Sequence, residues 1–232
     1  MQSTRTFVRS YLKKLPVGLI FLVAIIGGAL VLFSFVAHEV FWEKEYEIDD
    51  EVLDVLSNHV SNGLTGFMET VTHFASARYL QIAYGVLILA FVIKNFKRAI
   101  EIAAIGMGGF LLNYFMKLSF QRIRPPNPLI EPLQNFSFPS GHATSGFIFY
   151  GLLAYLIWKT DLPKVWKYIA GTILILFSLL IGFSRIYLRL HYPSDVIAGF
   201  CIGFAWLVLT IYLFEKLKKK TDKEQTKKYK DR

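Results

Sequence analysis

The sequence predicts an all-α integral membrane protein: a bundle of six transmembrane helices, with short interfacial helices between the first and second spans. Of its 232 residues, 54% are hydrophobic, and the mean hydropathy is +0.42. The apolar residues fall in blocks of about 20, the length that crosses roughly 30 Å of hydrocarbon. This composition argues against a disordered or an ordinary cytosolic chain. The single cysteine, Cys201, excludes an internal disulfide and a cysteine zinc cluster.

The six spans follow from uncharged runs in the sequence. Residues 17–37 follow a cationic stretch and form a run too long for a typical signal-peptide core, so they are expected to be the first span. The second span ends at Ile93 and begins between Val71 and Tyr79, because Arg78 lies where the helix would enter the membrane. The remaining spans are expected at about residues 99–116, 141–158, 166–183 and 196–214.

The segments outside the spans have distinct patterns. Apolar residues repeat at helical spacing in residues 48–56 and 64–74, which predicts two short helices lying in the membrane interface.

Three glycines in the third span, Gly106, Gly108 and Gly109, suit close helix packing. Residues 1–215 are therefore expected to form one domain. Residues 216–232 are polybasic and are expected to be a disordered cytoplasmic tail.

The cationic residues predict the orientation in the membrane. With six spans, 19 of the 26 Lys and Arg residues fall on the side that holds both termini and 7 on the other. Cytoplasmic segments carry this excess, so both termini are expected in the cytoplasm of a multi-pass cell-membrane protein. The net charge of +9 is explained by this distribution and does not predict a nucleic-acid partner.

Three polar clusters at the expected helix ends carry the chemistry. They are Lys117 with Arg124-Pro125, then Pro139-Ser140-Gly141-His142, then Ser184-Arg185 with His191 and Asp195. All three fall on the outer face under the six-span threading. Charged groups at the membrane edge are costly unless they reach water or serve a function. One site on the outer side is therefore expected.

The charges of this site predict an anionic ligand. Lys117, Arg124 and Arg185 supply three cations, and guanidinium groups match phosphate oxygens. Ser140 and Gly141 precede a helix whose free N–H groups also favour an anion. Since Asp195 is the only acid in the clusters, neither a catalytic metal site nor another cofactor is expected. The expected ligand is a phosphoryl group.

The two histidines suggest a nucleophile and an acid. Asp195 follows His191 by four residues, so it could hold Nδ1–H and leave Nε2 free to attack phosphorus. His142 could then protonate the leaving oxygen. Arg122 and Arg189 flank the clusters, and for them solvated surface and headgroup binding are equally consistent with the sequence.

The clusters resemble the signature K-x6-RP, PSGH and SR-x5-H-x3-D of the type 2 phosphatidic acid phosphatase family, with every fixed position matched in order. The resemblance implies that His191 is a phosphohistidine nucleophile, Asp195 its orienting partner and His142 the general acid. It implies that Lys117, Arg124, Ser140, Gly141 and Arg185 bind the phosphate. The implied substrate is a phosphorylated membrane lipid in the bilayer: phosphatidylglycerol phosphate, phosphatidic acid or undecaprenyl pyrophosphate.

Two other functions are compatible with the same residues. A vanadate-dependent haloperoxidase-like enzyme would use the same anion pocket without a nucleophilic His191. A non-catalytic lipid binder or transporter would not need a complete set of acid, base and nucleophile, and transporters more typically carry ionisable groups near the bilayer midplane. A membrane lipid phosphatase is therefore favoured, while the oligomeric state is not readable from the sequence.

Overall fold

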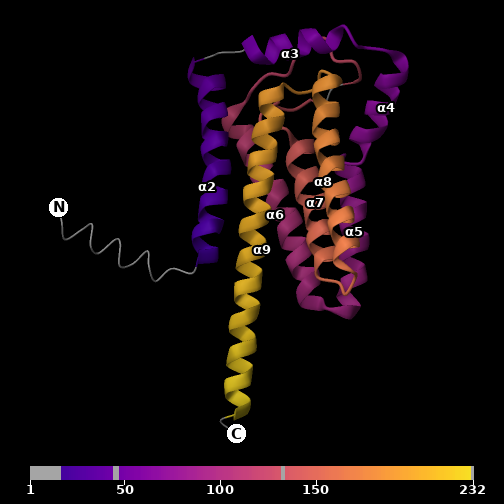
Figure 1. The fold of residues 1–232 in the computed structure, drawn as a ribbon. Helices are drawn as coiled ribbons and strands as arrows, with labels where there is room; N and C mark the ends of the chain where they lie inside the picture. Colours follow the sequence, from indigo (N-terminus) through magenta and orange to yellow (C-terminus); the bar gives the residue numbers. More distant parts are fainter. Residues whose placement is uncertain (1–16, 44–46, 132–133, 231–232) are drawn as a thin grey trace, which may run out of the picture.

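The structure, a computed structural model, describes residues 17–43, 47–131 and 134–230, and every regular element in those ranges is helical. The helices are α2 (Val17–His38), a π-helical turn (Glu39–Glu43), α3 (Glu47–Ser57), α4 (Asn62–His73), α5 (Ala77–Lys94), α6 (Phe96–Phe120), α7 (Gly141–Trp158), α8 (Lys164–Tyr187) and α9 (Pro193–Lys230). Figure 1 shows α3 lying across one end of the bundle, while the last part of α9 extends beyond the other end. The cationic stretch before the first expected span, which contains Arg5, Arg9, Lys13 and Lys14, lies outside the described residues.

Five helices are long and apolar enough to cross a membrane: α2 with the turn after it, α5, α6, α8 and α9. The prediction of a helical, multi-span chain is confirmed to this extent. The sixth expected span, α7, occupies the predicted residues 141–158 but is not among the five. Its first six residues, GHATSG, are small or polar, which lowers its mean hydropathy. The count of six spans and the interfacial position of α3 and α4 stay predictions.

Glycines on α6 allow close packing at the centre of the bundle. A Cβ on Gly108 would lie 2.3 Å from Cζ2 of Trp206, and one on Gly109 would lie 2.4 Å from Cδ1 of Ile148. Real Cβ atoms do not approach other atoms this closely, so larger residues would push α6 away from α7 and α9. The predicted packing role of these glycines is confirmed.

Side-chain caps determine where three of the long helices begin. Ser76 accepts a hydrogen bond from the backbone N–H of Tyr79 at the start of α5, and Asn95 accepts one from Arg98 at the start of α6. Ser140 does the same for Ala143 at the start of α7. Such caps satisfy N–H groups that have no partner within the helix.

The C-terminal segment differs from its expectation. The helix α9 continues to Lys230, so residues 216–230 are helical in the structure. Lysine and glutamate are good helix formers, which favours continuing a helix that the apolar part has already nucleated. Lys220 Nζ lies 3.9 Å from Oε1 of Glu224, one turn away, and such pairs add a little stability.

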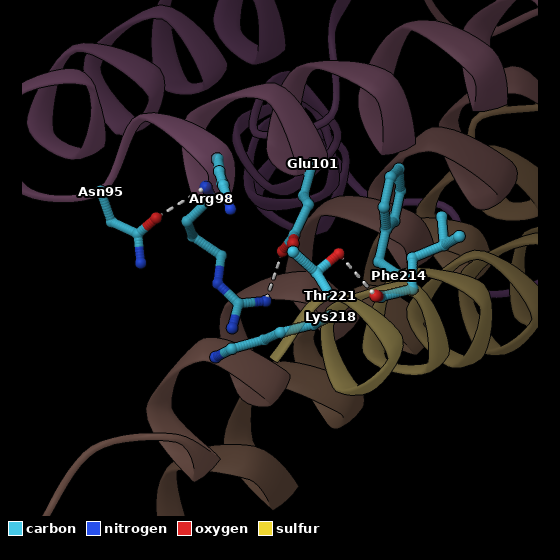
Figure 2. A pocket seen from close by; sticks show the side chains of 8 residues that line it. Asn95, Arg98, Glu101, Phe214, Lys218 and Thr221 are labelled. Carbon is cyan, nitrogen blue, oxygen red and sulfur yellow. Dashed lines mark hydrogen bonds and ion pairs between the residues drawn. The ribbon is translucent and has the colours of Figure 1, made fainter. Parts of the chain in front are cut away.

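A polar cluster joins α6, α7 and α9 at the end of the bundle away from α3. Arg98 donates to Oε2 of Glu101 at 2.6 Å and to the hydroxyl of Tyr155 on α7 at 3.2 Å. Glu215 on α9 accepts from Tyr155 and lies 3.0 Å from Nζ of Lys159. Figure 2 shows Arg98 and Glu101 beside α9, where they line a cavity of about 240 Å³. These contacts fix the three helices relative to one another.

Candidate active site

The eight predicted site residues lie at helix ends, at the end of the bundle that α3 crosses (Figure 1). Lys117 is in the last turn of α6, and Arg124 is in the loop after it. Ser140 caps α7, which begins with Gly141 and His142. Arg185 is in the last turn of α8, His191 is in the turn between α8 and α9, and Asp195 is in the first turn of α9. The structure brings all eight together through the contacts described below. Their chemical roles stay predictions.

Two left-handed residues turn the chain sharply toward the site. Gln121, with φ of 49°, ends α6, and Arg189, with φ of 55°, ends the turn after α8. Because of the second turn, the backbone N–H of His191 reaches the carbonyl of Arg185 at 3.2 Å. Pro193 then begins α9, a position at which proline costs no helical hydrogen bond.

His191 and Asp195 form a buried pair. Nδ1 of His191 lies 3.3 Å from Oδ2 of Asp195 and 3.2 Å from the hydroxyl of Ser137, and Nε2 faces Nη1 of Arg124 at 3.2 Å. A guanidinium can only donate, so Nε2 must be the accepting nitrogen. The proton of the neutral ring therefore lies on Nδ1, which faces both Asp195 and the hydroxyl of Ser137. In this tautomer Nε2 carries no proton, and its electron pair accepts from Arg124.

The surroundings of His191 favour the neutral ring. Burial, with the nearby cations Arg124, Lys117 and Arg185, holds the pKa of His191 well below its usual range. An imidazole must be uncharged to act as a nucleophile, and this environment disfavours the charged form of His191.

The loop before α7 holds the first two cations in place. Lys117 donates from Nζ to the carbonyl of Phe136 and, at 3.0 Å, to that of Ser137. Arg124 donates from Nε to the carbonyl of Asn135 at 2.9 Å and from Nη1 to that of Leu190 at 2.5 Å. Each cation is therefore oriented by neutral oxygens, which leaves its charge available to an anion.

Arg185 has an unpaired donor in the buried site. The residue is 3% exposed, and Nη1 donates to the hydroxyl of Thr72 on α4 at 2.9 Å. Nε has no hydrogen-bond partner within the described parts of the chain. A buried N–H without a partner is costly, and a phosphoryl oxygen would satisfy it.

The start of α7 adds helix N–H groups to the site. Ser140 donates its backbone N–H to the carbonyl of Asp195 at 2.9 Å, which joins α7 to α9. A Cβ on Gly141 would lie 3.2 Å from Oδ1 of Asn113 and 3.8 Å from Cε of Lys117, so this residue lies against α6. His142 lies within electrostatic range of Arg185, His191, Arg124 and Lys117. A helix start beside several cations is suited to an anion.

The structure adds residues that the motifs did not indicate. Ser137 is fully buried and donates to Oδ2 of Asp195. Its only signal in the sequence is its position two residues before Pro139. Of the two alternatives for Arg122, the solvated surface is wrong, because this side chain is buried and paired with Asp195 and Asp49. Headgroup binding by Arg122 stays a prediction. Arg189 is half-buried and donates to the carbonyl of Leu53 at 3.3 Å, so it is not a freely solvated cation either.

Metal-ligating side chains do not gather at this site. Among the residues the structure describes, no group of three or more His, Cys, Asp and Glu side chains could hold a metal ion. The positive charges near His191 are supplied by Arg124, Lys117 and Arg185, which suit a phosphoryl ligand.

Comparisons with known proteins agree with the fold and the motifs. The model of the PAP2 superfamily matches residues 98–219. The chain is 36% identical over 115 residues to phosphatidylglycerophosphatase B of Bacillus subtilis, a match that covers 47% of the chain and only 54% of that protein. It is 27% identical over 155 residues to undecaprenyl-diphosphatase BcrC of Bacillus subtilis, covering 63% of the chain and 72% of that protein.

A solved structure has the same fold. The crystal structure of the first transmembrane PAP2 type phosphatidylglycerolphosphate phosphatase from Bacillus subtilis superposes with a TM-score of 0.76. The sequence identity is 24%, and the alignment covers 82% of this chain and 96% of that one. At this identity the likeness is one of fold.

Proposed function

The chain belongs to the PAP2 superfamily, and on that basis we propose that it is a membrane lipid phosphatase that hydrolyses a phosphomonoester or pyrophosphate headgroup through a phosphohistidine intermediate. The observation that carries the proposal is the contact set of His191: Nδ1 directed at Asp195, and Nε2 beside the guanidinium of Arg124. A nucleophilic nitrogen held next to a phosphate-binding cation suits attack on phosphorus.

The reaction would proceed in two steps. In the first, Nε2 of His191 attacks phosphorus, an N–P bond forms, and the P–O bond to the lipid breaks as His142 gives its proton to the leaving oxygen. In the second, water attacks the phosphohistidine, gives a proton to His142, and the N–P bond breaks to release phosphate. Asp195 would stabilise the charge that His191 gains during attack.

The cations would stabilise the transition state. Phosphate-ester hydrolysis is among the slowest uncatalysed reactions, and enzymes lower such barriers by about 20 kcal/mol or more. The unpaired Nε of Arg185 could donate to a phosphoryl oxygen, and Arg124 could turn its Nη1 from Nε2 of His191 to another oxygen. The charge of Lys117 would add to theirs.

We further propose that α7 is a sixth span, with both termini cytoplasmic and the site on the outer side. The start of α7 lies beside Lys117 and its end beside Arg98, residues near the two ends of α6. Since α6 is long enough to cross the membrane, α7 follows it across most of that length. A site at headgroup depth would let a lipid enter sideways while its chains stay in the bilayer.

Phosphate release from a lipid panel in detergent, with a chelator present, tests the activity. Phosphatidylglycerol phosphate, phosphatidic acid and undecaprenyl pyrophosphate are the substrates to compare, with His191→Ala as the inactive control. We expect release from at least one lipid by the wild-type chain alone. No release from any of them, or release only after Mg²⁺ is added, would contradict the proposal.

Cysteine labelling in whole cells tests the side of the membrane. An impermeant thiol reagent should react with a cysteine placed at Asp50 and not with one placed at Lys97. Reaction at Lys97 alone would invert the topology and move the site to the cytoplasm.

A further inference from the structure

Arg122 is a buried cation held between two carboxylates. Its side chain is 6% exposed, Nη1 lies 2.7 Å from Oδ1 of Asp195, and Nη2 lies 2.7 Å from Oδ2 of Asp49. The guanidinium also lies 4.1 Å from the ring centroid of Tyr192. Burial alone would lower the pKa of Arg122, but the carboxylates of Asp195 and Asp49 raise it. The side chain is therefore a fixed positive charge.

The contacts of Asp195 divide between its two oxygens. Oδ2 receives the hydroxyl of Ser137 and the backbone N–H of Tyr192, and it faces Nδ1 of His191. Oδ1 is bound by Arg122. Because Asp195 is fully buried, Arg122 provides its compensating charge and determines how the carboxylate is turned toward His191.

Asp49 ties this pair to α3. It is 4% exposed and accepts from the backbone N–H of Ser194 at 2.9 Å and from the hydroxyl of Ser194 at 2.5 Å, besides its bond to Arg122. The other four acidic residues of α3 are exposed. Asp49 thus links the helix that crosses the end of the bundle (Figure 1) directly to the residues around His191.

Resting on the proposed function, we propose that Arg122 and Asp49 are positioning residues, which hold Asp195 in the orientation that His191 needs and make α3 part of the catalytic assembly. The relay runs from Asp49 to Arg122, from Arg122 to Asp195, and from Asp195 to His191. Neither Arg122 nor Asp49 belongs to the three motifs, and each acts through Asp195.

The relay predicts opposite electrostatic effects for its two members. Removing the positive charge of Arg122 leaves Asp195 uncompensated, which makes His191 easier to protonate. Removing the negative charge of Asp49 makes His191 harder to protonate, because the positive charge of Arg122 is then less balanced. The groups that otherwise face His191 are Asp195, Ser137, Arg124, Lys117, Arg185 and His142, and both changes leave them in place.

The test is the pH profile of kcat/KM for lipid hydrolysis by wild type, Arg122→Gln and Asp49→Asn. We expect kcat to fall by about 10- to 100-fold in each variant, the range seen when the partner of a site ligand is lost, with a smaller change in KM. The acidic limb of the profile is the pH range in which kcat/KM falls as the solution becomes more acidic. This limb should move to higher pH by about one unit in Arg122→Gln and to lower pH in Asp49→Asn. Arg122→Lys, which keeps the charge, should restore the wild-type position of the limb and part of kcat.

Arg189→Gln is the matched control. Arg189 also holds α3, through the carbonyl of Leu53, but within the described parts of the chain it has no hydrogen bond or ion pair with Asp195. Its loss should leave the acidic limb where it is in the wild type.

The outcomes separate the inference from the proposed function. A wild-type chain without phosphatase activity defeats the function itself. If the wild type is active, two results overturn the relay. In the first, the acidic limbs of Arg122→Gln and Asp49→Asn do not move; in the second, they move in the same direction. If Arg122→Gln does not fold, Asp49→Asn decides: an acidic limb that does not move to lower pH in that variant overturns the relay.

Discussion

Replacing Asp195 with asparagine should nearly abolish turnover although the side chain keeps its shape. The carboxylate accepts hydrogen bonds on both oxygens: from Arg122 on Oδ1, and from Ser137, the N–H of Tyr192 and His191 on Oδ2. An amide has only one accepting oxygen, so its NH₂ group must face donors in either orientation.

Each orientation of the amide has a different cost. If the NH₂ faces Arg122, a charged hydrogen bond of 2.7 Å is lost, which costs about 1.5 to 3 kcal/mol of stability, while Asp49 still compensates the guanidinium. If it faces His191, the ring must carry its proton on Nε2, and the nucleophilic electron pair is lost. A wrong tautomer of this kind lowers kcat by about 10⁴-fold, equivalent to about 5.5 kcal/mol of the barrier.

The assay compares lipid phosphate release by Asp195→Asn and by Asp50→Asn, a matched control at an exposed carboxylate of α3. We expect a loss of about 10⁴-fold in the first and near wild-type turnover in the second. Thermal unfolding in detergent shows whether each variant is folded. A folded Asp195→Asn variant with turnover within tenfold of the wild type would refute the assigned role of Asp195.

Three further predictions concern other parts of the molecule. His142→Ala should lose much of its turnover on lipid esters but little on an aryl phosphate, because a nitrophenolate leaves without a proton; an equal loss on both substrates would argue against the general-acid role. Because the pKa of His191 is held low, that residue takes up its proton at lower pH than an exposed histidine does. The value of kcat/KM should therefore persist as pH falls through about 6.5 and decline only below it. A decline of kcat/KM with its midpoint at or above about pH 6.5 would contradict this. Gly108→Leu should lower the thermal unfolding temperature because its side chain would meet Trp206, whereas Gly27→Leu, where a Cβ meets no atom within 4 Å, should not; equal effects would argue against close packing at Gly108.

The membrane spans could be predicted because lipid requires long apolar helices. The expected third span, residues 99–116, ends before the helix does, since α6 continues to Phe120 and includes Lys117. Hydropathy marks where the hydrocarbon ends, while the backbone stays helical beyond it. The expectation of a disordered tail after residue 215 rests on charge content, which does not distinguish an exposed helix from a coil.

The motif residues could also be predicted, but their surroundings could not. Spacing places His191 and Asp195 one turn apart, and the structure has them 3.3 Å apart between Nδ1 and Oδ2. Nothing in the sequence indicates that Asp49, among five acidic residues of α3, is the buried one. Its partner Arg122 lies 73 positions away, and no local pattern records a contact across that separation.

Trapping the covalent intermediate tests the central claim most directly. Wild-type protein mixed with a ³²P-labelled lipid substrate and quenched in alkali should carry label as a phosphoramidate, stable to base and labile to acid, that maps to the peptide containing His191. The same experiment with His191→Ala should give no labelled protein. Label retained in His191→Ala, or label stable to acid as a serine phosphoester would be, would contradict nucleophilic attack by His191.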